Sequence, residues 1–137
     1  MRPMSNPMRN KQFPFTPACR TLQDVLTDHD LAALGDAYTN LLYSLYLSTK
    51  TGKPAGARAN SYILSKALRQ SGLRELMPTR VDRHKQADAA ESLLVYAWLQ
   101  GLTTITESVE ALTKHESAAE GFSSLLSDAK KKSRFHR

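Results

Sequence analysis

Two long apolar runs limit what this 137-residue chain can fold into. Residues 34–47 read LGDAYTNLLYSLYL and residues 87–101 read ADAAESLLVYAWLQG. Both are longer than an ordinary strand, and neither shows the strict alternation of apolar and polar residues that is typical of a half-buried strand. Each run also places carboxylates near its start: Asp36 in the first, Asp88 and Glu91 in the second. The runs therefore predict two mostly apolar helices that each carry acid in the N-terminal half, where the acid needs water, a cation or a partner.

Capping and stop signals along the rest of the chain predict an all-α fold without strands. We expect Asp30 to cap the helix that contains the first run, and Gly52 and Gly72 to end the second and third helices. The sequence TITE (104–107) is typical of a capping box. The expected helices cover residues 21–26, 30–49, 57–71, 83–100, 104–115 and 117–127, with a short turn at 73–77.

Composition and length favour one ordinary globular domain, which we place at residues 18–127. A proline-rich basic segment, residues 1–17, is expected to be irregular, and residues 128–137 to form a basic tail. The single cysteine, Cys19, excludes an internal disulfide and a cysteine-rich zinc site. No apolar run approaches the length of a membrane span, and the N-terminus lacks the apolar core of a secretory signal. We therefore expect a cytoplasmic protein without a membrane partner.

Positive charge is concentrated at both ends and in the middle of the chain, and residues 1–20 and 121–137 each have a net charge of +4. Residues 50–85 contain nine Lys or Arg and only two acids, whereas residues 21–49 and 86–120 are net acidic. Basic loops beside acidic helices suit a polyanion that approaches a cation-filled site, although a solvated surface is the alternative interpretation. The candidates for phosphate contact are Arg58, Lys66, Arg69, Arg83 and Lys85.

The acids can form one site if the two apolar helices pack together. Asp88 and Glu91 are three residues apart and share a helix face, so both could meet Asp36, with Asn40 one turn further on. Clustered carboxylates repel one another and need protons or a divalent cation. Hard oxygen ligands suit Mg²⁺ or Mn²⁺. The alternative is that Asp88 and Glu91 occupy a solvated first turn that favours negative charge.

The two runs, with their neighbours, resemble a known family. LAALGDAYTNLLYSLYL and HKQADAAESLLVYAWLQG are similar, in order, to the two signature helices of the ribonuclease III family, and GARANSYILSKALRQSGL resembles the helix between them. The resemblance covers roughly residues 20–113. It implies the single-domain helical fold of the ribonuclease III endonuclease. It also implies a homodimer that hydrolyses double-stranded or structured RNA and leaves 5′-phosphate and 3′-hydroxyl ends.

The same resemblance implies site residues. Asp36, Asp88 and Glu91 match the family acids that hold catalytic Mg²⁺ (or Mn²⁺), and Asn40 would add a neutral oxygen. Two positions depart from the bacterial enzymes: Ala32 and Asn40 stand where those have glutamates. These departures look more like the compact branches, the archaeal ribonuclease III-like proteins and the Mini-III enzymes. A catalytically inactive RNA-binding or scaffolding protein on this fold is the alternative, although the three matching carboxylates favour the enzyme.

Overall fold

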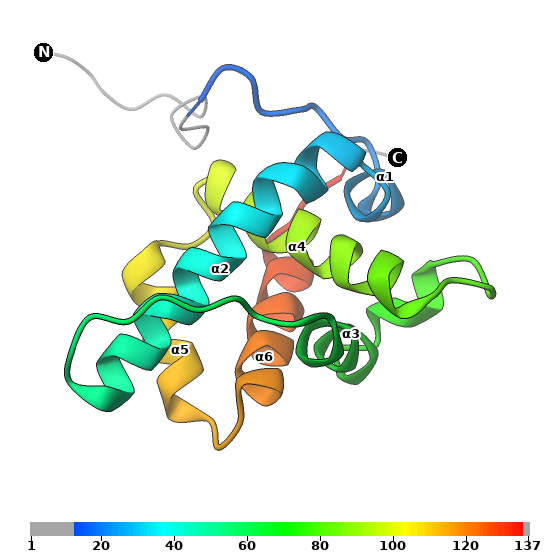
Figure 1. Ribbon diagram of the computed structural model, residues 1–137. Helices are drawn as coiled ribbons and strands as arrows, with labels where there is room; N and C mark the ends of the chain where they lie inside the picture. Colours follow the sequence, from blue (N-terminus) through cyan, green and yellow to red (C-terminus); the bar gives the residue numbers. More distant parts are fainter. Residues whose placement is uncertain (1–12, 136–137) are drawn as a thin grey trace, which may run out of the picture.

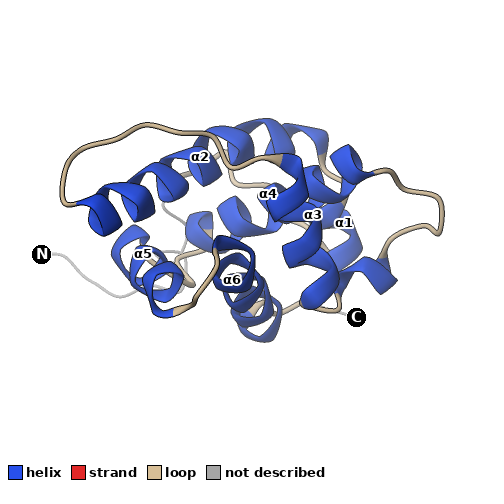
Figure 2. Ribbon diagram, turned by 60° about the horizontal axis from the view of Figure 1, so that its bottom comes forward, coloured by secondary structure: helices blue, strands red, loops and turns tan. Residues whose placement is uncertain are grey.

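The computed structural model describes residues 13–135, and this part of the chain is helical without any strand (Figures 1 and 2). The all-α prediction is therefore confirmed. Most of the segment expected to be irregular, residues 1–17, lies outside the described residues; residues 13–17 form a turn and extended chain. The helices are α1 Leu22–Leu26, α2 His29–Thr51, α3 Ser61–Gln70, α4 Arg83–Leu99, α5 Ile105–Lys114 and α6 Ala118–Lys132, with a 3₁₀ turn, η2, at Leu73–Leu76.

Several helix ends fall where the sequence signals place them. Gly52 and Gly72 have φ angles of 77° and 83°, a left-handed conformation that glycine adopts without strain, and they end α2 and follow α3. Thr104 and Glu107 form the expected capping box at the start of α5. These signals work because the donors and acceptors lie within a few residues of each other.

Three predicted ends are wrong. Asp28, not Asp30, caps α2, because its carboxylate accepts the Leu31 N–H at 2.9 Å. The third helix begins at Ser61 instead of residue 57, because residues 52–60 lie extended along α2. The last helix continues past residue 127 to Lys132, with Ala129 buried against the core. Part of the expected basic tail is therefore helical.

Helix α4 forms the centre of the domain. It packs against α1, α2, α3 and α6, and its middle residues 89–97 are buried on every side. Figure 1 shows α2 running across α4, with α5 and α6 on the side of the molecule away from α1. Because residues 89–97 are buried, an acid in the middle of α4 is held inside a packed core. None of the helices within residues 13–135 is long and apolar enough to cross a membrane.

Candidate active site at the crossing of α2 and α4

The site is built on a close helix crossing at Gly35. A Cβ atom at this position would collide with the backbone carbonyl oxygen of Glu91 and would lie 2.6 Å from the carbonyl carbon. Only glycine therefore allows α2 and α4 to approach to this distance. Asp36 follows directly on α2, so the crossing brings its carboxylate beside that of Glu91.

Glu91 is a buried acid, with only 5% of its surface exposed. Burial raises its pKa to about 8, and the charge of Asp36, a hydrogen bond with Asp36 and the charge of Asp88 act in the same direction, while Arg58 opposes them. At neutral pH this carboxyl group therefore holds a proton unless a cation takes its place. Two neighbouring carboxylates, one buried and one half-exposed, are a donor set that suits a hard divalent cation.

Asp36 is half-exposed and is held from two sides. The Arg58 guanidinium lies 3.5 Å from its Oδ2, and Asn40 Nδ2 donates to its Oδ1 at 3.4 Å. The orientation of the Asn40 amide follows from its other contact, because its Oδ1 accepts the Ala59 N–H at 2.9 Å. Asn40 thus turns its amino group to Asp36, and its oxygen is occupied by the backbone.

Arg58 reaches the site because residues 52–60 are fastened along α2. Figure 1 shows this segment running back beside α2 toward α3. Four helical residues advance by about 6 Å and two extended residues by about 6.6 Å, so contacts can repeat in register. Three polar side chains of α2 hold every second residue of the segment: Ser48 bonds Ala55, Ser44 bonds Ala57 and Asn40 bonds Ala59.

Asp88 occupies different surroundings from Glu91. It is exposed and borders a hollow of about 240 Å³ together with His29, Ala32 and Lys85. Its charge still raises the pKa of Glu91. Within residues 13–135, no three His, Cys, Asp or Glu side chains gather closely enough to hold a metal ion. The structure thus brings Asp36 and Glu91 together, with Asp88 one turn away and the short side chain of Ala32 beside it.

Comparison with protein-family models gives a match over residues 29–131, to a family described as ribonuclease III. The chain belongs to the ribonuclease III family. The match runs from the start of α2 to the last turn of α6, so it includes both helices of the crossing. No match was found among curated proteins. The family supports a ribonuclease-type function with RNA as the substrate, and its members typically use divalent metals.

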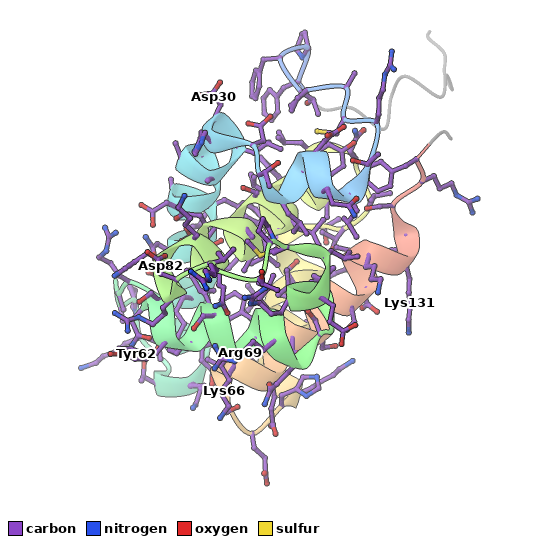
Figure 3. All side chains as sticks on the ribbon, turned by 90° about the vertical axis from the view of Figure 1, so that its right-hand side faces the viewer. Asp30, Tyr62, Lys66, Arg69, Asp82 and Lys131 are labelled. Carbon is purple, nitrogen blue, oxygen red and sulfur yellow. The ribbon has the colours of Figure 1, made fainter. Side chains whose placement is uncertain are left out.

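For a ribonuclease III family protein, the positions of the five predicted phosphate-binding residues are informative. Lys66 and Arg69 are exposed on α3, and Figure 3 shows them on the same side of the molecule as Tyr62. Arg83 and Lys85 lie in the first turn of α4, and Arg58 lies next to Asp36. Arg58 thus lies at the crossing itself, Lys66 and Arg69 lie on α3, and Lys85 borders the hollow beside Asp88.

The sequence analysis did not identify Tyr62 as a functional candidate. Its ring packs against the Arg83 guanidinium, with the guanidinium carbon 3.8 Å from the ring centre. The signal was present in the spacing, because Tyr62 lies four residues after Arg58 and four before Lys66. An aromatic residue at helical spacing within a basic stretch indicates a nucleic-acid contact when it is exposed.

Proposed function

We propose that this protein is an endoribonuclease that requires Mg²⁺ or Mn²⁺ and hydrolyses phosphodiester bonds in double-stranded or structured RNA. The products would carry 5′-phosphate and 3′-hydroxyl ends, as expected when water is the nucleophile. The observation that carries the proposal is the buried Glu91 carboxyl beside Asp36 at the Gly35 crossing. Family membership supplies the general activity and the class of substrate.

Asp36 and Glu91, which the crossing brings together, are the residues that we propose to hold the cation and to act in catalysis, and Asp88, one turn away, would add its negative charge to the site. When bound, such a cation makes water a better nucleophile and neutralises charge on the phosphoryl oxygens. Glu91 would lose its proton as the cation binds, because the favourable charge then outweighs the effect of burial. Asn40 keeps Asp36 oriented, and the tight crossing keeps bulk water away from Glu91.

Arg58, Lys66, Arg69, Arg83 and Lys85 would contact the RNA backbone. The shallow minor groove of A-form RNA presents phosphates and 2′-hydroxyl groups, so a helical surface reads the shape of the duplex more than its sequence. Arg58 has a particular position, since its guanidinium lies between Asp36 and solvent. When a cation neutralises the acids, the Arg58 guanidinium can leave the Asp36 carboxylate and bind a phosphate of the RNA instead.

We further propose that the protein acts as a homodimer, since a duplex has two strands and one domain carries one acid pair. Supporting this, Leu34, Ala37 and Leu41 form an exposed apolar stripe on α2, at helical spacing, whereas Leu42 and Tyr46 enter the core. Light scattering at micromolar concentration should give twice the mass of the chain. A strict monomer would contradict the dimer.

One observation favours a second function, that of an inactive RNA-binding or scaffolding protein. Ala32 provides no carboxylate where the bacterial enzymes have one, and no three-acid group forms within residues 13–135. Against it, a binding protein gains nothing from a buried acid pair near RNA, because the negative charge repels phosphates.

A cleavage assay distinguishes the two functions. An end-labelled RNA duplex is incubated with the protein in Mg²⁺, in Mn²⁺ or in EDTA, and the single strand alone serves as the control. We expect cuts in the duplex with either metal and none in EDTA, with fragment ends that a ligase accepts without prior phosphorylation. Binding without cleavage under all three conditions would support the scaffolding function.

A further inference from the structure

Tyr62 is a large aromatic side chain that the fold leaves uncovered. It is 65% exposed, although it lies at the second position of α3, close to the packed start of α4. Its only described ring contact is Arg83, whose guanidinium carbon lies 3.8 Å from the ring centre. Arg83 is fixed in turn, because its Nε donates to Ser61 Oγ at 2.8 Å. One ring face is thus backed by a held cation, and the rest of the ring is open to solvent.

Cations predominate around the ring, although Asp82, the N-cap of α4, directly precedes Arg83. Tyr62, Lys66 and Arg69 follow one another at helical spacing on the outer face of α3, and α3 contains no acid (Figure 3). Arg83 and Lys85 lie in the first turn of α4, where the helix dipole disfavours cations. Positive charge therefore gathers here against the local preference of the helix, and a polyanion is the partner that offsets it.

We propose that Tyr62, backed by Arg83, is a platform on which an unpaired base of the RNA stacks, while Lys66 and Arg69 contact the neighbouring phosphates. The inference rests on the proposed function for the nature of the partner, and it adds recognition of an unpaired nucleotide beside a duplex. Bases within a duplex already stack on one another, so away from the duplex ends an exposed ring can stack only on a base that has left the helix. Such stacking tolerates any base, because every base has a π face.

The position of the platform has a consequence for cleavage. Arg83 precedes Glu91 by eight residues on α4, which corresponds to about 12 Å along the helix axis. An unpaired base on Tyr62 would therefore fix the RNA at a constant offset from the acids. Cuts should fall a set number of nucleotides from the unpaired position, and moving that position along the stem should move the cuts with it.

A binding experiment tests the platform without depending on cleavage. Two RNAs share one stem: one is fully paired, and the other carries a single unpaired 2-aminopurine. Anisotropy of a distant label in EDTA gives both dissociation constants, and the fluorescence of 2-aminopurine reports stacking. We expect the RNA with the unpaired base to bind about tenfold more tightly, with a loss of 2-aminopurine fluorescence on binding.

Variants assign the effect to the ring. Tyr62→Ala should remove the preference and the fluorescence loss while leaving the affinity for the paired RNA within about twofold, since the ring contributes only to stacking. Tyr62→Trp should retain both. Arg83→Lys keeps the charge but loses the planar group behind the ring, so it should reduce the preference. Phe15→Ala is the matched control, because it removes another aromatic side chain of similar exposure, 62%, away from α3.

Each outcome has a distinct meaning. Equal affinity of the parent protein for the two RNAs, or an unchanged preference in Tyr62→Ala, overturns the platform and leaves the proposed nuclease intact. Absence of binding to either RNA overturns the proposed function itself. Circular dichroism of Tyr62→Ala and Tyr62→Trp at matched temperatures verifies that both variants are folded, as the exposure of the side chain leads us to expect.

Discussion

Helix α4 has two regions that differ in almost every physical respect. Its first turn, residues 83–85, is basic and largely open to solvent, whereas its middle, residues 89–97, is buried and carries one acid, Glu91. Water and salt screen the exposed charges of the first turn, so their attraction for a polyanion depends on how many there are and on the salt concentration. The protonation of Glu91 is set by its burial, which depends on the close packing of α2 and α4 at the crossing. In the proposed function one helix supplies both the attraction for RNA and a catalytic acid, so changes in the two regions should separate affinity from turnover.

The largest expected effect is on turnover and comes from the two acids at the helix crossing. Glu91→Gln and Asp36→Asn should each reduce cleavage on the order of a thousandfold or more, because the cation loses a charged ligand. Without a cation, RNA binding should be unchanged in Glu91→Gln, because the parent carboxyl is already protonated at neutral pH, and unchanged or tighter in Asp36→Asn, which removes a negative charge. Single-turnover cleavage in Mg²⁺ and anisotropy in EDTA measure the two quantities.

Asp30→Asn is the matched control for these variants. It makes the same chemical change on α2 at an exposed position in the first turn, and it should cleave like the parent. Parental cleavage rates in both Glu91→Gln and Asp36→Asn would show that the acid pair is not catalytic.

The next effect is a pH dependence of stability in the metal-free protein. The pKa of Glu91 is raised from 4.5 to about 8 in the folded state, so the folded state binds this proton more tightly than the unfolded chain does. The resulting stabilisation is complete below pH 4.5 and is lost as the pH rises through 8, at about 1.4 kcal/mol per pH unit at most. The Tm measured in EDTA should therefore fall between pH 5 and pH 8.5 in the parent by more than in Glu91→Gln.

Metal addition sharpens the same prediction. Because the cation must displace the proton of Glu91, Mg²⁺ should raise the Tm more at pH 8 than at pH 5. If the Tm of Glu91→Gln depends on pH in the same way as that of the parent, Glu91 is not the titrating group, and its pKa is not raised by the site.

A third effect follows from the geometry of the crossing. Gly35→Ala places a methyl group against the backbone of Glu91, and such overpacking costs about 1–3 kcal/mol. Gly56→Ala is the control, since no atom lies within 4 Å of the added Cβ and its φ is not positive. Urea unfolding should show a loss of stability for Gly35→Ala alone. Equal stability of both variants would mean that α2 and α4 can separate without penalty.

The sequence predicted those parts of the molecule that depend on nearby residues. Helix periodicity and end signals such as Gly52 and the Thr104 capping box are local, and all of the expected helices are present. The i, i+3 spacing predicted that Asp88 and Glu91 share a face of α4; the structure places Glu91 at the crossing and leaves Asp88 exposed one turn away. Spacing could not tell which acid lies at the crossing, because Gly35 decides this from another helix.

Other features depended on contacts between distant segments. Residues 57–60 have ordinary helix-forming composition, yet Ser44 and Asn40 bind their backbone and keep them extended. Asp28 instead of Asp30 caps α2, because the buried Leu31 donates its backbone N–H to the Asp28 carboxylate. The exposure of Tyr62 depends on the meeting of α3 with α4, which no local pattern encodes.

The smallest expected effect concerns the exposed cations. Lys66→Gln combined with Arg69→Gln should weaken binding to all duplexes by about tenfold and should lower the slope of log K against log salt by about two, because two phosphate contacts are lost. Lys130→Gln combined with Lys131→Gln is the matched control: it removes the same charge from α6, and Figure 3 shows Lys131 well apart from Lys66 and Arg69.

If the two pairs of variants weaken binding equally, the net charge of the protein attracts the RNA and the α3 face has no special role. If Lys66→Gln with Arg69→Gln affects only particular sequences, these side chains contact bases instead of phosphates. A larger loss for the α3 pair, equal across sequences, would place the backbone of the duplex along α3 and the start of α4, within reach of the buried acid pair.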